Sequence, residues 1–359
     1  MIFLLLPEIR PDLLKQLKKD KKILIGLGHP AHFHLFKNLI HSLPEKDVLV
    51  VISNKDILKV LLEENNIKYE LLAEYGNKQN PFSKMIKLVR TTSKLLRITI
   101  KYKPEILIGC LSQIAWVGFL TRKRTLFFAE DDFAYTSIQC RITYPFVTNV
   151  LTAEEVNVGP FEKKQIKYPA YHKLAYLHPE VFQKNPSVLD KYLIKTPYFI
   201  VRIVSLSAHH DTNIQGVTEP MLDAIIEELS KHGRVILSNE KKLSDRYQKF
   251  QQPIEVSDMH QLMSQSKGIV SDSQSMTVEA CMLGIPNIRI NSFKGKISVL
   301  NNLETNYHLT KSYSTSEFNI QNLDFILTAD IIEFDKNRKR LLKDKIYPIP
   351  FYLKQIEKL

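Results

Sequence analysis

The feature that most limits the fold of this chain is a repeated alternation of short apolar runs with longer amphipathic segments. Lys22 to Leu27 is an aliphatic run, and Phe33 to Leu43 then places apolar residues at helical spacing. The same pairing recurs three times: Asp47 to Ser53 with Lys55 to Asn65, Ile106 to Cys110 with Gln113 to Leu120, and Thr125 to Glu130 with Tyr135 to Thr143. Strands that alternate with helices predict a parallel sheet covered on both faces.

A second alternation follows a proline-punctuated stretch, Glu154 to Pro197, which we interpret as an interdomain linker. Its expected strands and helices are Tyr198 to Ile203, Thr218 to His232, Arg234 to Ser238, Ile254 to Val256, Asp258 to Ser266, Gly268 to Asp272, Ser275 to Leu283 and Asn287 to Ile290. A chain of 359 residues also exceeds the usual size of a single core. We therefore expect an α/β fold with two Rossmann-like, doubly wound parallel-sheet domains, residues 1–165 and 166–340, facing across a cleft.

Composition narrows the class of protein. The three cysteines, Cys110, Cys140 and Cys281, are too scattered for a disulfide framework or a zinc motif, which fits a reducing cytoplasm. The apolar opening, Ile2 to Leu6, is too short to span a bilayer and lacks the basic start of a signal peptide. We expect neither a transmembrane helix nor a signal peptide.

The formal net charge of +12 predicts an anionic partner. Six cations recur at spacings of three and four without an intervening acid: Lys84, Lys87, Arg90, Lys94, Arg97 and Lys101. Such a stripe is either a solvated helix face or a contact for an anionic membrane or acceptor. The apolar segment Ile2 to Leu6 and the amphipathic segment Leu13 to Lys22 could add a second interfacial contact. No nucleic-acid recognition motif is present, so we expect no nucleic acid partner.

Ligands of open parallel sheets bind beyond the carboxyl ends of the strands, so polar residues there are candidates for a site. His29 and His32 follow the first strand and could act as acids or bases; the alternative is that His34 simply packs on the helix and His32 caps it. We expect no metal, because these histidines lack a nearby carboxylate or cysteine ligand. Glu130 and Asp131 could act as bases at the end of a strand, and Asp132 is better interpreted as a helix cap.

The second half offers a nucleotide site. Arg202 ends a strand and could hold a diphosphate, although a structural ion pair is equally compatible. The run from Ser271 to Ala280 is a hydroxyl-rich loop that opens a helix, where free amides favour phosphate, or where Ser273 or Ser275 simply caps the helix. The candidate nucleotide-sugar-binding residues are Arg202, Ser207, His209, Ser238, Ser273, Ser275, Met276, Thr277 and Glu279.

These motifs together resemble the family called domain of unknown function 354. Its members are similar to glycosyltransferase-B and non-hydrolysing UDP-N-acetylglucosamine 2-epimerase proteins. The resemblance runs from about Lys22 to about Asn291 and is carried by five segments: His29 to His32, Tyr168 to Pro179, Val201-Arg202 with Ser207 to His209, Ser271 to Glu279, and Gly284 to Pro286. It departs at Gly26, where a polar residue is expected, and at Ser271 to Gln274, where glycines are expected.

The resemblance implies the glycosyltransferase-B architecture, with a C-terminal helix, residues 341–359, that packs on the first domain. We expect a metal-independent, cytoplasmic glycosyltransferase, peripheral on the membrane, that moves a sugar from a nucleotide-sugar to a lipid-linked or glycan acceptor and has no cofactor. His29, His32 or Asp131 would be its base. The alternatives are an isomerase resembling the 2-epimerases, which needs a carboxylate to remove the proton at sugar C2, and a protein that binds a nucleotide-sugar without turnover.

Overall fold

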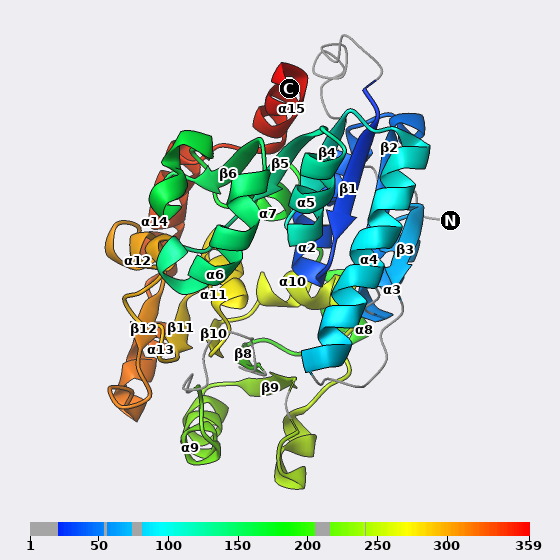
Figure 1. Cartoon of the computed structure of the whole chain (residues 1–359). Coiled ribbons are helices and arrows are strands. Elements are labelled where there is room, and N and C mark those ends of the chain that lie inside the picture. Colours follow the sequence, from blue (N-terminus) through cyan, green and yellow to red (C-terminus); the bar gives the residue numbers. More distant parts are fainter. Residues whose placement is uncertain (1–20, 54–55, 74–80, 205–215, 241) are drawn as a thin grey trace. The chain divides into compact units, whose positions relative to one another are not determined.

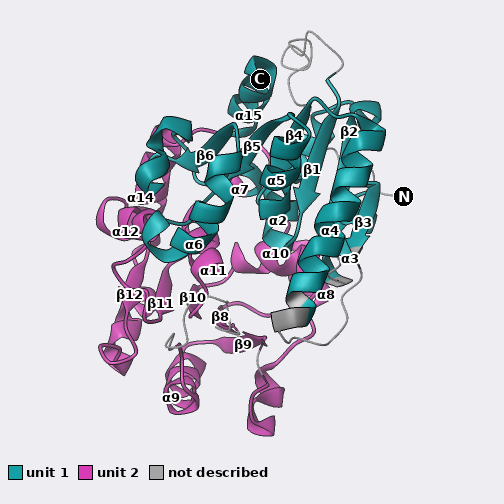
Figure 2. Cartoon of the chain, in the orientation of Figure 1, with its two compact units in different colours: residues 1–176, 347–359 teal, residues 177–346 magenta. Residues whose placement is uncertain are grey.

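The computed structural model describes residues 21–53, 56–73, 81–204, 216–240 and 242–359 (Figure 1). The chain divides into two compact units, which Figure 2 distinguishes by colour. The first unit comprises Met1–Tyr176 and Tyr347–Leu359, and the second comprises Leu177–Ile346. The expected interfacial segments, Ile2 to Leu6 and Leu13 to Lys22, lie outside the described residues except for Lys21 and Lys22.

The first unit is built on a parallel sheet to which the described residues contribute seven strands, in the order β3-β2-β1-β4-β5-β6-β7. The strands are β1 (Ile23–Leu27), β2 (Val48–Ser53), β3 (Tyr69–Ala73), β4 (Ile106–Gly109), β5 (Arg124–Phe128), β6 (Asn149–Ala153) and β7 (Gln165–Tyr168). Its helices are α2 (Pro30–His41), α3 (Asp56–Glu64), α4 (Pro81–Tyr102), α5 (Ser112–Leu120), α6 (Phe133–Thr143) and α15 (Ile349–Lys358), with 3₁₀ turns η1 (Glu45–Asp47), η2 (Tyr144–Phe146) and η3 (Gly159–Lys164).

The strand order reverses between β1 and β4. Because parallel crossovers are right-handed, strands added on opposite sides of β1 send their helices to opposite faces of the sheet. Helices α2 and α3 contact each other on one face, and α4, α5 and α6 form a layer on the other (Figure 1). This reversal is a topological switch point, where ligands of such sheets usually bind.

Glycines permit close packing at the reversal. Gly26 of β1 and Gly109 of β4 are in register, and a Cβ built on Gly109 would lie 2.7 Å from the Gly26 carbonyl oxygen. A Cβ on Gly26 would lie 2.7 Å from the Cδ1 atom of Ile114, at the start of α5. Gly26, which stands where a polar residue was expected, therefore makes room for α5 against the sheet.

The C-terminal helix α15 packs on the α2 face of this same unit. The ring of Phe128, at the end of β5, lies 4.9 Å from the Phe36 ring of α2 and 4.8 Å from the Tyr352 ring of α15. The Tyr352 hydroxyl donates a 2.9 Å hydrogen bond to the Tyr168 hydroxyl, and both side chains are buried. Helix α15 thus closes the core behind the ends of β5 and β7.

The second unit contains a smaller parallel sheet with five described strands in the order β12-β11-β10-β8-β9. These are β8 (Tyr198–Ile203), β9 (Arg234–Asn239), β10 (Gly268–Ser271), β11 (Asn287–Ile290) and β12 (Lys311–Tyr313). The helices are α7 (Leu174–Leu177), which crosses the unit boundary, then α8 (Ser187–Lys191), α9 (Glu219–Ser230), α10 (Met259–Met263), α11 (Gln274–Leu283), α12 (Ser298–Thr305), α13 (Asp324–Leu327) and α14 (Ile331–Asp344), with η4 (Asp245–Phe250), η5 (Val256–Asp258) and η6 (Ile320–Leu323).

The prediction of two doubly wound parallel-sheet units is confirmed, but four strands were missed and one was wrongly expected. The missed strands are β3, β6, β7 and β12. Three of them, β3, β7 and β12, lie at sheet edges, where one side of the ladder is unpaired and the apolar run is interrupted by polar residues. The expected strand Ile254 to Val256 is wrong, because Val256 begins η5. The expected linker Glu154 to Pro197 also contains β7, α7 and α8.

Replacing Gly109 by Ala should lower the free energy of unfolding by about 1–3 kcal/mol, because the new methyl group meets a backbone oxygen that cannot rotate away. Urea denaturation followed by circular dichroism measures this loss. A loss below about 0.5 kcal/mol, the range typical of surface substitutions, would contradict the tight contact between β1 and β4.

Candidate functional site

The end of β5 in the first unit carries a carboxylate that is held by a buried ammonium. The Glu130 Oε2 atom lies 2.9 Å from the Lys173 Nζ atom. The Lys173 side chain is only 4% exposed, whereas the Glu130 side chain is 30% exposed. A buried cation needs a partner, so Lys173 fixes the position of Glu130 and stabilises its negative charge. Glu130 was one of the candidate bases that the sequence left open.

A neutral histidine lies behind this ion pair. The Nδ1 atom of His172 is 4.0 Å from the Glu130 Oε2 atom, and its ring stacks on Tyr168 with centroids 6.2 Å apart. Burial, the largest cause, lowers the pKa of His172 to about 4, while Glu130 raises it and Lys173 lowers it by smaller amounts. His172 is therefore uncharged at neutral pH and leaves Lys173 as the cation beside Glu130.

The two aspartates after Glu130 differ in their surroundings. Asp131 is exposed. Asp132 is buried and stands at the cap position of α6, yet its side chain makes no capping bond to that helix. Its Oδ1 atom instead accepts a 2.9 Å hydrogen bond from the Asn157 amide. Asp132 occupies the predicted cap position but ties the start of α6 to the loop after β6.

His29 and His32 lie together at the start of α2, with ring centroids 6.1 Å apart. The Nδ1 atom of His29 caps the helix by accepting from the Ala31 amide, and the Nδ1 atom of His32 accepts from the Gly28 amide, each at 3.1 Å. A backbone amide can only donate, so the neutral form of each ring carries its proton on Nε2. These rings are arranged to donate hydrogen bonds rather than to take up a proton.

The third histidine of this motif packs against aromatic rings, as one alternative held, but the cap of α2 is His29 and not His32. The His34 ring lies 5.1 Å from the Tyr176 ring and 5.2 Å from the Phe33 ring. Among the described residues, no group of three or more His, Cys, Asp or Glu side chains is placed to hold a metal ion.

In the second unit, five polar side chains form one row across the sheet near the strand ends. The pairing registers place the members level with one another, in the order Ser238, Arg202, Ser271, Arg289 and Ser312. Residues in register on parallel strands point to the same face. Their neighbours along each strand, such as Val201 and Ile288, belong to the core that packs under α9, so the row occupies the opposite face.

The two arginines of this row bond to the serines at its ends. The Arg202 Nη1 atom donates to the Ser238 hydroxyl at 2.6 Å, and its Nη2 atom pairs with Glu240. The Arg289 Nε atom donates to the Ser312 hydroxyl at 3.3 Å. Arg289 is only 1% exposed, and burial lowers its pKa to about 10. Its Nη1 atom has no hydrogen-bond acceptor among the described residues.

The loop after β10 leads from this row into α11. Ser271 accepts from the Ser273 amide at 2.8 Å, and Ser273 caps α11 by accepting from the Met276 amide at 3.3 Å. Thr277 donates to the Ser273 carbonyl oxygen at 2.8 Å, and the side chains of Met276 and Thr277 are buried. The interpretation of Ser273 as a cap is confirmed. Ser275 is exposed in the first turn, where helix amides favour an anion.

Glu279 of α11 faces α10. Its Oε1 atom lies 3.3 Å from the Nε2 atom of His260, and both side chains are mostly buried. The predicted residues Ser207 and His209 lie outside the described residues.

Several site residues escaped the sequence analysis. Lys173 and His172 stand inside a run of tyrosines, alanines and leucines from Tyr168 to Leu177, and a lysine within an apolar run is a signal for a buried ion pair. Arg289 sits within the strand Asn287–Ile290 and carries the same signal.

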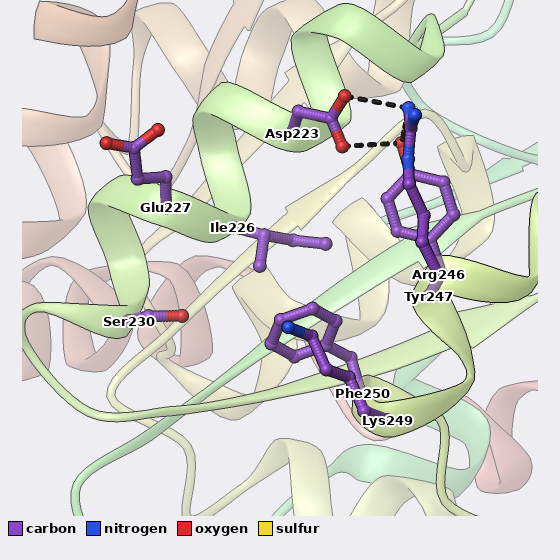
Figure 3. A pocket seen from close by; sticks show the side chains of 8 residues that line it. All are labelled: Asp223, Ile226, Glu227, Ser230, Arg246, Tyr247, Lys249 and Phe250. Carbon is purple, nitrogen blue, oxygen red and sulfur yellow. Dashed lines mark hydrogen bonds and ion pairs between the residues drawn. The ribbon is translucent and has the colours of Figure 1, made fainter.

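A hollow in the second unit lies away from these groups. Figure 3 shows its lining by α9 and η4, from residues Asp223, Ile226, Glu227, Ser230, Arg246, Tyr247, Lys249 and Phe250. Asp223 pairs with Arg246 at 2.7 Å and accepts from the Tyr247 hydroxyl at 2.8 Å. Because its polar groups bond to one another on the α9 face, opposite the arginine row, we assign it no part in the site.

No family model and no curated protein matches this chain. Solved structures do match, with nearly complete coverage but low sequence identity. A putative UDP-N-acetylglucosamine 2-epimerase from Listeria monocytogenes aligns with a TM-score of 0.66 at 14% identity, covering 92% of this chain and 93% of that one. The UDP-GlcNAc 2-epimerase of Neisseria meningitidis, bound to UDP-GlcNAc, aligns with a TM-score of 0.63 at 15% identity, covering 94% and 98%.

HepE from Anabaena, in complex with UDP and glucose, aligns with a TM-score of 0.61 at 14% identity, covering 94% of this chain and 99% of that one. Together these matches show that the chain has the glycosyltransferase-B-like fold of the UDP-N-acetylglucosamine 2-epimerases. Membership of the domain of unknown function 354 family stays a prediction.

The buried His172 should make stability depend on pH. Between pH 6.5 and about 4 the unfolded chain binds a proton at this residue while the folded chain does not, so the free energy of unfolding falls as the pH is lowered. From pH 7 to pH 5 this residue should account for about 2 kcal/mol of the loss. Urea titrations of the wild type and His172→Phe measure the difference, and an equal pH dependence in both would show that His172 is not buried neutral.

Proposed function

We propose that this chain is an enzyme acting on a nucleotide-sugar, and that its reaction is an epimerisation at C2 of the sugar rather than glycosyl transfer. The observation that carries the proposal is the carboxylate at the end of β5, Glu130, fixed by the buried Lys173. Epimerisation requires a group that removes a proton from carbon, and a positioned carboxylate is a suitable base. The likeness in fold to several UDP-N-acetylglucosamine 2-epimerases supports the same reaction class.

In this proposal Glu130 removes the C2 proton, the electron pair of that C–H bond forms a C1–C2 double bond, and the C1–O bond to the diphosphate breaks. Return of the diphosphate oxygen to C1 and of a solvent-derived proton to the opposite face of C2 gives the epimer. Lys173 keeps the carboxylate charged and oriented. The Glu130 side chain is partly exposed although its Oε1 atom is buried, and the burial of Lys173 prevents the ammonium from swinging away into water. His29 and His32 bind rather than deprotonate, since their Nδ1 atoms already accept backbone amides. Their Nε2–H groups suit the oxygens of the sugar or the diphosphate.

The second unit holds the nucleotide in the same proposal. Arg202 offers a partly exposed guanidinium at the end of β8, and the first turn of α11 offers backbone amides beside Ser273 and Ser275. Both are suited to diphosphate oxygens. Glu279 lies beside His260, and Ser238 lies beside Arg202. Each would accept a hydrogen bond from a hydroxyl group of the substrate or would orient its neighbour. The neighbours from Neisseria meningitidis and Anabaena were both solved with a uridine nucleotide bound.

A glycosyltransferase is the second candidate, and the exposed carboxylate of Asp131 favours it. Asp131 directly follows Glu130 at the end of β5 and has no role in the first proposal. As a base for an acceptor hydroxyl it would act without a metal. Epimerase and transferase therefore differ in which of two adjacent carboxylates is essential.

The full chain incubated with UDP-N-acetylglucosamine in D₂O should incorporate deuterium at C2 of the sugar, because the proton removed from carbon exchanges with solvent before it returns. Glu130→Gln should slow this exchange at least about 100-fold, the usual effect of removing a general base. Proton NMR of the C2 signal measures it. Glu162→Gln, which alters an exposed carboxylate in η3, is the matched control and should keep the wild-type rate.

Two outcomes would contradict epimerisation, and a third would contradict the role of Glu130. UDP release that depends on an added acceptor and is lost in Asp131→Asn, without deuterium at C2, would establish the transferase. Binding of the nucleotide-sugar with neither reaction would establish a protein without turnover. Unchanged exchange in Glu130→Gln would remove that residue from the reaction.

Nucleotide binding by the second unit predicts that Arg202→Met weakens the affinity for UDP by about 10- to 100-fold, the effect of losing a charge-assisted hydrogen bond. Arg234→Met is the matched control, because Arg234 lies at the opposite, amino-terminal end of the same sheet and bonds to the Leu193 carbonyl oxygen. Isothermal titration calorimetry with UDP compares the two. Equal affinities would exclude Arg202 from the nucleotide site.

A further inference from the structure

The positive charge of the chain is concentrated in one layer of helices. Residues 81–102, 112–124 and 133–146, which form α4, then α5 with its following turn and the first residue of β5, and then α6 with η2, contain ten Lys or Arg residues and no Asp or Glu. The whole chain has a net charge of +12, so the remaining residues contribute only +2. The layer lies on the face of the first sheet opposite α2 and α3 (Figure 1).

Helix α4 exposes two stripes side by side. Its buried side is formed by residues such as Leu95 and Ile98, which pack on the sheet. At 100° per residue, the cations Arg90, Lys94 and Arg97 cluster on the far side of the helix. On one side of the helix, a stripe of exposed apolar residues lies between these cations and the buried side: Met85, Ile86, Val89 and Ile100. Met85 is 64% exposed, so these residues do not serve the core of the unit.

Helices α5 and α6 continue this pattern. The Phe119 side chain at the end of α5 is 60% exposed and contacts the half-exposed ring of Phe146, with centroids 5.2 Å apart. Ile138 of α6 is 67% exposed. The cations of this part of the layer are Arg122, Lys123, Arg124 and Arg141.

We propose that the outer surface of α4, α5 and α6 docks on the surface of a membrane that contains anionic lipids. Exposed aliphatic and aromatic side chains enter the boundary between headgroups and acyl chains, and the adjacent cations attract lipid phosphates. No helix in the described part of the chain is long and apolar enough to cross a bilayer. The proposal does not depend on which reaction the enzyme performs.

Charge and composition favour lipid over the other anionic or apolar partners. A second copy of the chain would bring ten cations against ten cations, with no acidic side chain in these helices to pair with them. Nucleic acid would match the charge but not the aliphatic stripe, because unpaired bases stack on aromatic rings. The interface of an anionic bilayer can bind both parts of this surface, because its phosphates pair with the cations and its acyl chains accommodate the apolar side chains.

The test uses the full chain with vesicles of phosphatidylcholine alone or with 30% phosphatidylglycerol, a composition chosen as about one-third anionic. We expect cosedimentation with the anionic vesicles only, and weaker binding as salt is added. The chain has a single tryptophan, Trp116 of α5, whose indole donates to the Ile142 carbonyl oxygen of α6. Binding should therefore shield Trp116 fluorescence from quenching by acrylamide.

Two matched charge variants locate the surface. Lys94→Gln with Arg97→Gln should lower the vesicle partition coefficient by about 30-fold, from the usual contribution of a basic residue near an anionic surface. Lys336→Gln with Lys343→Gln removes two exposed cations from α14 and should leave it unchanged. Val89→Ser with Phe119→Ser should weaken the binding that persists at high salt, because that part depends on apolar insertion.

Equal binding to both vesicle compositions, or none to either, would overturn the proposal. So would an equal loss of binding in the α14 variant, which would indicate a response to net charge alone. Self-association that protects Trp116 without lipid, or preferential binding to an oligonucleotide, would assign the surface to another partner.

Discussion

Right-handed crossovers between parallel strands determine where every functional group of the first unit lies. Because all strands of its sheet are parallel, their carboxyl ends share one edge, and because the order of strands reverses between β1 and β4, the helices divide into two layers. The close contact of Gly26 with Gly109 allows this reversal to pack tightly against α5. His29 and His32 follow β1 at that edge, and Glu130 follows β5 there. One topological rule thus assembles residues that are a hundred positions apart in the chain.

The chain stabilises polar groups at these strand ends by burying their partners rather than the groups themselves. In the first unit, Lys173 is buried and its partner Glu130 is partly exposed. In the polar row of the second sheet, Arg289 is buried and Arg202 is partly exposed. A buried cation is costly unless it is paired, so such residues are seldom placed where they serve only the core. In His172 the same desolvation lowers the pKa far enough to keep the ring neutral. Burial therefore sets both the charge and the orientation of the groups that a substrate can reach.

Periodicity predicted the architecture well but the site only in part. Central strands such as β1 and β8 are buried on both faces, so their uninterrupted apolar runs were recognisable. Edge strands such as β7, in which two half-buried residues precede the exposed Lys167 and the buried Tyr168, leave no such run. Glu130 was a candidate because it follows a strand, but its partner Lys173 lies 43 positions later and no local pattern joins them. Asp132 and His29 show a second limit: a sequence indicates that a helix begins nearby, but not which side chain bonds to which amide.

The strand-end edge of the first unit and the outer face of α4 to α6 are constrained differently. The fold fixes which residues can stand at the edge, but it leaves the exposed residues of the outer face open. The strand-end edge is constrained by the sheet, since a group such as Glu130 must stand at a strand terminus and be held there by an interior partner. The outer face of α4 to α6 is constrained only to keep residues such as Leu95 in the core, so its exposed positions are free to vary. Exposed positions that only contact solvent normally carry charges of both signs, interspersed. These segments contain no acidic residue and therefore depart from that pattern. Ten cations in segments that contain no acidic residue repel one another and weaken the compact state, and a surface of that kind persists most readily where an anionic partner offsets the repulsion.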